Sequence, residues 1–413
     1  MNDNNSFIIK PFAPAYGGLS IGKWNNKIVL IKGAIEGELV EVRIESEKKD
    51  YFIANTLKAI EKSPDRVMPE CEYFGVCGGC HYQYVSYPRQ VKLKEEILQD
   101  CINRIAKIDV QISESLFNEI PWRYRYRGQF KVFDRKIGFY REKTRDVVDI
   151  KKCPLMIDDV NKCLEVVRER LIKSENLGHI SEIHISCGDV CIALIKAKNI
   201  KKLNQKGLSE LFYDISLGIF FDGRFFPVSG KQYITLSLNG LKYTVSPLSF
   251  FQSHWKLNEA VVNMVKKELQ PLHNKIVLDL YSGAGNFSIP LSQISKDVIA
   301  IEENPHVVKD GKRNIKINQI KNCKFICTPV ENAHIQKTDI IVVDPPRSGL
   351  TNKTLEKLLN SGAERIVYIS CNPSTLARDV RKLMKKYKIE SLRMIDFFPQ
   401  TYHIESICFL RLK

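Results

Sequence analysis

Short apolar runs alternate with helical patterns in the last part of the chain, from about residue 249 onwards. Four runs have the length and β-branched content of buried strands, at residues 276–280, 298–303, 339–343 and 367–369. Strands that alternate with helices form a parallel sheet with helices on both faces. The pattern therefore predicts a doubly wound α/β domain over residues 249–413.

The first part of the chain has a different pattern. Residues 1–62 contain short apolar runs cut by Gly and Asn pairs, which are typical of a small β-barrel. Residues 63–248 begin with a cysteine-rich stretch, continue with a helical pattern at about 90–105 and then become rich in strands. We therefore expect three domains, and the helix at 90–105 has an apolar face with which it could pack on the last of them.

The composition is that of an ordinary globular protein with a strong basic excess. The chain has 413 residues, a hydrophobic content of 44% and a formal net charge of +16. Such a charge suits a polyphosphate partner, because displaced counterions favour association; a basic surface without a partner explains it equally well. No run of about 18 apolar residues could span a membrane, and the start MNDNNSFIIK lacks the layout of a signal peptide. We expect a cytoplasmic protein that acts as a monomer.

Twelve cysteines in a cytoplasmic chain argue against a disulfide framework and towards metal, cluster or nucleophile chemistry. In CEYFGVCGGC, Cys71, Cys77 and Cys80 are spaced C-x5-C-x2-C, and the double glycine lets the backbone fold round a ligand. Cys153, which precedes a proline, is the best fourth ligand. Four thiolates suit a tetrahedral zinc ion or a 4Fe–4S cluster, and the distant fourth cysteine favours the cluster. Six others lie in apolar or periodic stretches and are interpreted as packing residues: Cys163, Cys187, Cys191, Cys323, Cys327 and Cys408.

A glycine-containing turn follows the first strand of the α/β domain. In DLYSGAGNF, Gly283 and Gly285 permit a nucleotide-like ligand to approach the backbone. Glu302 ends the next strand about twenty residues later, where an acid can bind the two hydroxyls of a ribose. A third glycine and a phosphate-binding lysine are missing from the turn, so we expect a ribose without a pyrophosphate. This combination indicates S-adenosylmethionine rather than NAD.

Residues at the ends of the following strands carry candidate chemistry. KFIC, residues 324–327, is taken as the third strand of the predicted sheet. Asp344 begins Asp-Pro-Pro-Arg after the fourth strand, at 339–343, and Cys371 follows the fifth, at 367–369, with Ser374-Thr375 predicted as the N-cap of the next helix. Carbon 5 of uracil is too weak a nucleophile to attack a methyl sulfonium unless a thiolate first adds to carbon 6. That reaction needs an activated cysteine and a carboxylate that removes the carbon 5 proton. The sequence offers Cys371 and, near its carboxyl end, Glu405.

Several longer motifs resemble a known family. The amino-terminal barrel resembles a TRAM domain, an OB-like barrel attached to RNA-modifying enzymes. CEYFGVCGGC, SPLSFFQ, DLYSGAGNF, DPPRSGL, ISCNPSTLARD and FPQTYHIES resemble the RNA 5-methyluridine methyltransferases, in the subgroup that carries an iron–sulfur cluster. The resemblance implies a class I (Rossmann-like) methyltransferase domain with an amino-terminal OB-like barrel and a small β-rich central domain carrying the cluster. It implies Cys371 as nucleophile and Glu405 as proton acceptor. It also implies a set of residues that bind S-adenosylmethionine, of which the first and last would touch the uracil too: Gln252, Tyr281, Asn286, Glu302 and Asp344.

The stretch 121–145 is the best candidate for RNA contact. It holds nine Lys or Arg, and aromatic residues alternate with arginines from Trp122 to Arg127. On a strand this alternation places the aromatics on one face and the guanidinium groups on the other. We expect the aromatics to face the core and the arginines to face water and RNA phosphates. A uridine in folded RNA must be swung out to reach the nucleophile.

Four readings of the function stay open. The favoured substrate is 23S rRNA, because relatives with the cluster mostly act on large-subunit ribosomal RNA. The same chemistry on the T-loop uridine of tRNA is the first alternative. RNA 5-methylcytosine methylation also uses a cysteine, but typically one in a Pro-Cys pair at the end of strand four, where this chain has Pro-Pro-Arg. A non-catalytic RNA-binding platform is the alternative from another class.

Overall fold

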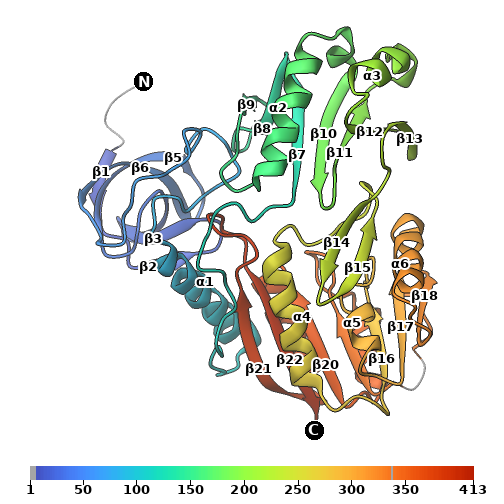
Figure 1. The fold of residues 1–413 in the computed structure, drawn as a ribbon. Coiled ribbons are helices and arrows are strands. Elements are labelled where there is room, and N and C mark those ends of the chain that lie inside the picture. Colours follow the sequence, from blue (N-terminus) through green and yellow to red (C-terminus); the bar gives the residue numbers. More distant parts are fainter. Residues whose placement is uncertain (1–5, 336–337) are drawn as a thin grey trace.

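The computed structural model describes residues 6–335 and 338–413, which form three large β-sheets, a separate hairpin and the helices that cover them (Figure 1). The amino-terminal sheet (blue) lies to one side in Figure 1, with the central sheet (green) above and the carboxyl-terminal sheet (yellow to red) below. Within the described residues, no helix is long and apolar enough to cross a membrane.

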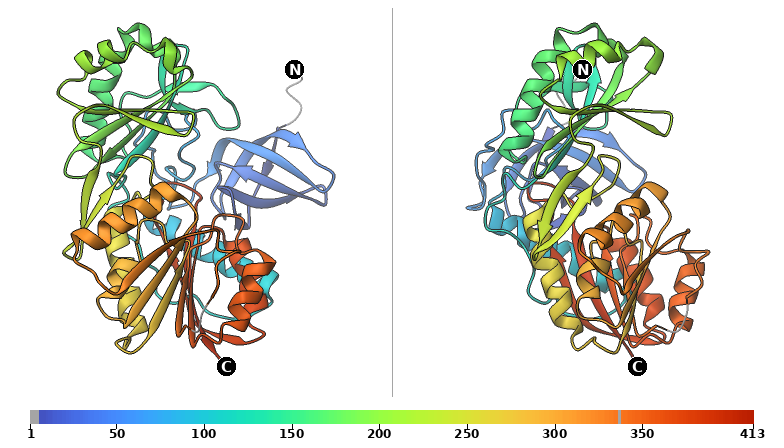
Figure 2. Two further views of the ribbon diagram at one scale, coloured as in Figure 1. Left: turned by 90° about the vertical axis from the view of Figure 1, so that its right-hand side faces the viewer. Right: turned by 45° about the vertical axis from the view of Figure 1, so that its right-hand side comes forward.

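The amino-terminal sheet has six strands in the order β1-β5-β6-β4-β3-β2. Its strands β4 and β6 run parallel, and the other neighbours are antiparallel. Alternate residues such as Val29 and Ile31, or Val40 and Val42, point into one small core, which explains the two-residue apolar period. The sheet curls round this core, as the two views of Figure 2 show. The strands are β1 (Ser6–Ile9), β2 (Ala13–Ala15), β3 (Leu19–Trp24), β4 (Lys27–Lys32), β5 (Leu39–Glu47) and β6 (Tyr51–Glu61).

The central part of the chain is rich in strands, with a seven-stranded sheet in the order β13-β12-β11-β10-β7-β8-β9. Helix α2 packs on this sheet through an apolar stripe that includes Val160, Leu164 and Val167. The strands are β7 (Arg127–Phe133), β8 (Lys136–Tyr140), β9 (Val147–Asp149), β10 (Ile180–Cys187), β11 (Cys191–Ala197), β12 (Ser216–Phe221) and β13 (Arg224–Ser229). The helices are α2 (Asp158–Ile172), α3 (Gln205–Leu211) and two short 3₁₀ segments, Glu175–His179 and Ile200–Lys202.

Two cysteines of this sheet pack in its core, as predicted, and are in addition bonded to each other. Cys187 and Cys191 pair directly across the β10–β11 hairpin, with Cα atoms 4.0 Å apart, and form a disulfide. The hairpin register brings the two thiols together, and a sequence alone does not show that register. Cys327, also interpreted as a packing residue, is exposed, because it ends the edge strand β18 of the third sheet.

The carboxyl-terminal sheet has the order β18-β17-β16-β19-β20-β22-β21, with its first five strands parallel and β22 antiparallel to both neighbours. This confirms the predicted α/β class and the Rossmann-like sheet. The strands are β16 (Ile276–Leu280), β17 (Asp297–Glu302), β18 (Cys323–Cys327), β19 (Ile340–Val343), β20 (Arg365–Ser370), β21 (Tyr387–Ile395) and β22 (Glu405–Leu412). The helices are α4 (Trp255–Leu269), α5 (Ser288–Ser292), α6 (Pro305–Ile317), α7 (Asn352–Asn360) and α8 (Pro373–Leu383).

The N-cap of helix α8 lies two residues before the position predicted for it. The side-chain oxygen of Asn372 accepts hydrogen bonds from the backbone N–H groups of Ser374, at 3.0 Å, and Thr375, at 3.5 Å. Pro373 occupies the first helical turn, where its missing N–H costs nothing. The prediction of Ser374-Thr375 as the N-cap is therefore wrong, and Asn372 caps the helix directly after Cys371.

Two segments that precede residue 249 share the core of the carboxyl-terminal sheet. Helix α1 (Tyr87–Cys101), with its π-helical extension Ile102–Ala106, packs beside α8. The hairpin β14 (Ile234–Leu238) and β15 (Leu241–Val245) packs with α4 on the other face. The domain boundaries drawn from the sequence stay predictions. The packing shows that residues before 249 contribute side chains to the hydrophobic core of the carboxyl-terminal sheet.

Candidate active site

The carboxyl ends of the parallel strands form the edge at which an open α/β sheet binds ligands. After β16 the backbone turns through Tyr281 and Gly283, which have φ of 59° and 56°, and Gly285, with φ of 99°. At Gly285 an added Cβ would meet the Ile289 side chain at 2.7 Å, so this position requires glycine. The turn predicted from the two glycines is therefore present in the structure.

Several predicted cofactor residues lie along this edge. The Glu302 carboxylate ends β17 and accepts a hydrogen bond from the Gly283 N–H at 3.1 Å. The Tyr281 hydroxyl donates to Glu331 at 3.5 Å, and Asn286 exchanges two side-chain hydrogen bonds with Asn258, at 2.7 and 3.1 Å. These contacts orient three polar side chains round the glycine turn.

Gln252 lies outside that edge in the chain, in the loop that joins β15 to α4, where it is half-buried. The loop is held by a hydrogen bond from the Tyr126 N–H to the Ser253 carbonyl, at 3.0 Å. Phe250, two residues earlier, is 63% exposed, and the Arg127 guanidinium lies over its ring. The central part of the chain therefore positions this loop.

Strand register brings Cys371 and Glu405 together. Strands β20 and β22 are antiparallel, and their last registered pair is Ser370 with Ser406. One step further along both strands, Cys371 lies opposite Glu405. Side chains opposed in this way have Cβ atoms about 5 Å apart. Residues 34 positions apart in the sequence thus lie close together, and Asp344 at the end of β19 is near enough to act on the pKa of the same thiol.

Burial is the main cause of the raised pKa values of Cys371, Glu405 and Asp344. It raises the pKa of the Cys371 thiol to about 12, and the Glu405 and Asp344 carboxyl groups add to the rise while Arg347 opposes it. Burial also raises the pKa of Glu405 well above its usual range, again with help from Asp344. The pKa of Asp344 is raised to about 7 by burial. At neutral pH the free protein therefore keeps the Cys371 thiol protonated.

Two further residues at this site were missed in the sequence. Tyr16, from the β2–β3 turn of the amino-terminal sheet, packs edge-on against Tyr402, with ring centroids 5.5 Å apart. Burial raises the pKa of Tyr16 to about 12; Tyr402, Cys371 and Glu405 add to the rise, and Arg347 opposes it. His403 lies 3.3 Å from the Arg347 guanidinium. The glycine pair after Tyr16 signals a turn, but no local pattern indicates that this turn reaches the strand edge.

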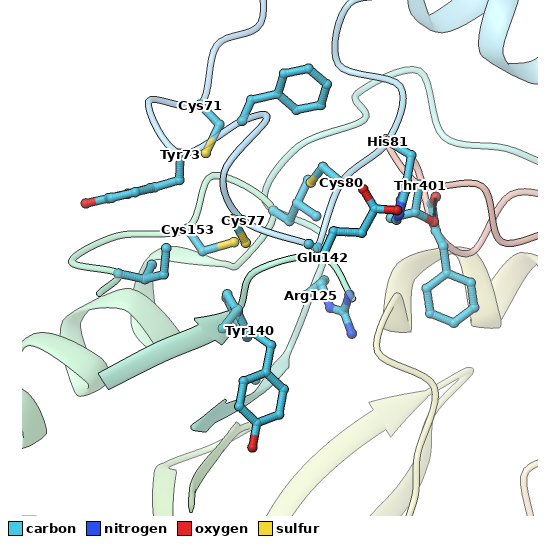
Figure 3. Close-up of a pocket in the computed structure, with 18 of the residues that line it drawn as sticks. Cys71, Tyr73, Cys77, Cys80, His81, Arg125, Tyr140, Glu142, Cys153 and Thr401 are labelled. Atoms are coloured by element: carbon cyan, nitrogen blue, oxygen red, sulfur yellow. Dashed lines mark hydrogen bonds between the residues drawn. The ribbon is translucent and has the colours of Figure 1, made fainter. Parts of the chain in front are cut away.

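The four candidate metal ligands surround one space. Cys71, Cys77, Cys80 and Cys153 line a cavity of about 870 Å³, and their sulfur atoms face a common space (Figure 3). All four are free thiols. Burial raises the pKa of Cys80 to about 12 and that of Cys153 to about 11, and it also raises the pKa of Cys77.

Local hydrogen bonds shape the two ends of this cavity. The Gly78 N–H donates to the Tyr140 carbonyl at 3.0 Å, and a Cβ at Gly78 would meet that same oxygen at 3.0 Å. The Asn161 side chain accepts from the Cys153 N–H, at 2.9 Å, and donates to its carbonyl, at 3.0 Å. The double glycine and the distant cysteine are therefore held in place by the backbone of the central sheet and by α2.

Four cysteine thiols at one cavity supply the donor atoms of a thiolate-bound metal group. Four thiolates on one zinc ion lie about 3.8 Å apart, because the Zn–S bond is about 2.3 Å long. Over residues 6–335 and 338–413, no group of three or more His, Cys, Asp or Glu side chains is arranged to hold one metal ion. Four free cysteines round a shared cavity are compatible with a larger iron–sulfur cluster, which spreads its thiolates further apart.

The prediction for the arginines of residues 121–127 is wrong in part. Residues 121–126 form no strand, and β7 begins only at Arg127. Arg127 is 8% exposed and donates to the Ser249 carbonyl at 3.2 Å, and burial lowers its pKa to about 10. Arg125 lines the cavity of the four cysteines instead of facing open water. Tyr124 is buried, as predicted.

Comparison with known proteins decides the family. A family model described as tRNA (uracil-5-)-methyltransferase matches residues 86–413. The chain belongs to this family. It is an S-adenosylmethionine-dependent RNA (uracil-5-)-methyltransferase, which confirms the activity expected from the motifs.

Relatives of this methyltransferase match over nearly its whole length. An uncharacterized RNA methyltransferase of Aquifex aeolicus is 35% identical, with 96% of each chain covered. The 23S rRNA (uracil(1939)-C(5))-methyltransferase RlmD of Shewanella amazonensis is 30% identical over 96% of this chain and 93% of its own. The crystal structure of a Pyrococcus abyssi tRNA (uracil-54, C5)-methyltransferase with S-adenosyl-L-homocysteine is 25% identical, with a TM-score of 0.78 over 99% of this chain and 100% of that one.

Proposed function

We propose that this methyltransferase methylates carbon 5 of one uridine in 23S rRNA through a covalent adduct on Cys371, with Glu405 as the base. The observation that carries the proposal is the strand register that sets Cys371 opposite Glu405 at the ligand-binding edge. The chemistry needs one thiolate and one carboxylate beside the same ring. The RlmD relative, which acts on 23S rRNA, supports the choice of substrate.

The reaction begins once the Cys371 thiol and the Glu405 carboxyl group have released their protons to solvent. The Cys371 thiolate adds to carbon 6 of the uracil, and carbon 5 then attacks the methyl group, releasing S-adenosylhomocysteine. The Glu405 carboxylate takes the carbon 5 proton, the electron pair of that bond restores the ring double bond, and the sulfur–carbon 6 bond breaks. A positive sulfonium bound beside Asp344 favours the anionic forms of Cys371 and Glu405, whose pKa values are high in the free protein.

The proposed cofactor site uses the glycine turn and the strand ends. Glu302 binds the ribose hydroxyls, at the edge where it already accepts the Gly283 N–H. Tyr281, Asn286, Gln252 and Asp344 complete the S-adenosylmethionine site. Gln252 and Asp344 also contact the uracil.

The first experiment identifies product and substrate together. Total RNA from a strain that lacks this gene is incubated with the purified enzyme and methyl-labelled S-adenosylmethionine, separated by size and digested to nucleosides. We expect label in 5-methyluridine from 23S rRNA. Label in the tRNA fraction would keep the chemistry and move the substrate to tRNA, the second candidate, which the similarity to the Pyrococcus abyssi tRNA enzyme favours. Label in 5-methylcytosine, or no label, would contradict the proposal.

Two variants test the mechanism. Cys371→Ala should abolish both methylation and the covalent adduct while S-adenosylmethionine still binds, because the nucleophile is lost and the glycine turn is intact. Glu405→Gln should accumulate a methylated enzyme–RNA adduct, visible on a denaturing gel, because the carbon 5 proton cannot leave. Turnover by the first variant, or clean product release by the second, would refute the assigned roles.

We also propose that Cys71, Cys77, Cys80 and Cys153 hold a 4Fe–4S cluster. The amino-terminal sheet is proposed to be a TRAM-like barrel that assists RNA binding. The enzyme is proposed to be a monomer that acts in the cytoplasm. When bound, the cluster would supply four iron–thiolate bonds that join the loops round the cavity. Anaerobically purified protein should be brown, and Cys77→Ser should be colourless and iron-poor. Cys327→Ser, at an exposed position, is the matched control. Equimolar zinc in the wild-type protein would overturn the assignment.

A further inference from the structure

The segment 396–403 (DFFPQTYH) precedes Glu405 and is fixed by parts of the chain that lie outside the carboxyl-terminal sheet. Gln400, which it contains, has φ of 68° although it is not glycine. Such a left-handed backbone costs of order 1 kcal/mol and persists only where the surroundings hold it. The contacts that hold it come from helix α1 and from the cysteine-rich loop, residues 71–86, which carries Cys71, Cys77 and Cys80.

Gln90 of helix α1 makes the central contact. Its side chain is fully buried, and its amide donates to the Gln400 side-chain oxygen at 2.9 Å. Its own oxygen accepts from the Gln400 backbone N–H at 3.0 Å. The same amide donates to the carbonyls of Tyr82, at 3.0 Å, and Val85, at 2.8 Å. One side chain therefore joins the cysteine-rich loop to the segment before Glu405.

The cysteine-rich loop also contacts this segment directly. The N–H groups of His81 and Tyr82 both donate to the Gln400 carbonyl, at 2.8 and 3.0 Å. The His81 ring, next to Cys80 in sequence, packs edge-on against Tyr402 with centroids 4.5 Å apart. Close to Glu405, the segment thus rests on the loop that carries three of the four cysteines.

A second buried pair anchors the start of the segment. The Lys94 ammonium of helix α1 donates to Asp396 at 2.7 Å and to the Phe398 carbonyl at 3.0 Å. Both charged side chains are fully buried. Together with Gln90, this pair makes one face of α1 a polar support for the segment. An apolar contact would bury the segment equally well, but it would not fix which residue of the segment faces helix α1.

We propose that Gln90 is a positioning residue that aims Glu405 at the carbon 5 proton, through its hydrogen bonds to both the side chain and the backbone of Gln400. The inference rests on the role proposed above for Glu405. Catalytic groups must be held within about 0.5 Å of the productive geometry, and a misplacement of about 1 Å can cost about 100-fold in rate. Loss of the Gln90 amide therefore slows proton removal more than it slows methyl transfer.

The test separates these two steps. Gln90→Met keeps the length of the side chain and removes its hydrogen bonds. It is incubated with total RNA from the deletion strain and methyl-labelled S-adenosylmethionine; nuclease-trimmed samples then go on a denaturing gel. We expect a labelled adduct at the enzyme's mass and a rate of free 5-methyluridine release about 10- to 100-fold lower. Affinity for S-adenosylmethionine should stay within about twofold.

The matched control is Gln99→Met, on the same helix. The Gln99 amide donates to Asn103 and to the Val110 carbonyl, away from the 396–403 segment. This control should release product like the wild type, without labelled adduct. If Gln90→Met does not fold, Gln400→Met carries the test, because it keeps the backbone bonds to His81 and Tyr82 and loses only the side-chain acceptor; it too should accumulate adduct.

Glu405→Gln serves as the reference for failure. If it traps adduct while the folded Gln90 or Gln400 variant does not, the positioning role is overturned and the proposed base survives. Equal slowing of methyl transfer and release, with no adduct, would likewise show a merely structural role. If Glu405→Gln traps no adduct, the proposed base itself is wrong and this inference falls with it.

Discussion

Replacing Lys94 by methionine should destabilise the segment 396–403 far more than a surface change on the same helix. Both Lys94 and its partner Asp396 are completely buried, with the ammonium 2.7 Å from the carboxylate. Burial lowers the pKa of Lys94, and Asp396 opposes that shift. Without the ammonium, the bonded Asp396 oxygen keeps one backbone donor, the Phe398 N–H at 3.3 Å. Removing one partner of a buried pair costs about 3–5 kcal/mol.

Hydrogen exchange of peptides that cover 396–403 is the suitable assay, because a chain of several units does not unfold in two states. We expect Lys94→Met to reduce protection of these amides about a hundredfold or more, since each 1.4 kcal/mol is tenfold. Lys92→Met, at an exposed position of α1, is the control. The double variant Lys94→Met/Asp396→Leu should recover most of the loss, because no unpaired charge remains. Equal protection in Lys94→Met and Lys92→Met would refute the reasoning.

Three further predictions follow from the electrostatics and from the contact of the amino-terminal sheet. Burial raises the pKa of Asp279 to about 7, above its unfolded value, so the native state binds the extra proton and stability falls as pH rises from about 4 to 7, by at most about 4 kcal/mol from this group. Asp279→Asn should make this fall smaller, while the part due to Asp344 stays; unfolding temperatures that change with pH as in the wild type would contradict it. Burial raises the pKa of Cys371 to about 12, so iodoacetamide should alkylate Cys371 far more slowly at pH 7.5 than the exposed Cys327. Peptide mass spectrometry measures both rates. Equal rates would show that the Cys371 thiol is accessible and ionised. Tyr16→Ala should raise the KM for RNA about tenfold, because an aromatic ring on which a base can stack is lost, and it should leave the affinity for S-adenosylmethionine unchanged. Tyr16→Phe, which keeps the ring, should have a KM near that of the wild type. An unaltered KM in the alanine variant would show that Tyr16 does not contact RNA.

Local patterns predicted the features that depend on neighbours in sequence. The alternation of apolar strands and helical patterns indicated the Rossmann-like sheet, and the glycines at 283 and 285 indicated its ligand turn. Strand ends also marked Asp344 and Cys371, because the carboxyl edge of a parallel sheet follows from the chain direction alone. The cap of α8 was misplaced by two residues, since proline and asparagine compete with serine for the same short-range role.

Contacts between distant residues needed the folded chain. The pairing of Cys371 with Glu405 depends on the insertion of β22 between β20 and β21, which no local period reveals. The burial of Arg127 and the Cys187–Cys191 bond depend in the same way on which strands and loops pack side by side.

By itself, the sequence determined the class of fold, the ligand-binding edge and the residue types available for chemistry, because these follow from side-chain period, turn residues and chain direction. How that chemistry is assembled depends on contacts that form in the folded chain. The tertiary structure set Glu405 opposite Cys371, brought Tyr16 from the amino-terminal sheet and placed Gln90 under Gln400. Such contacts arise from the packing of whole elements, whose free energy is shared among many residues far apart in the chain.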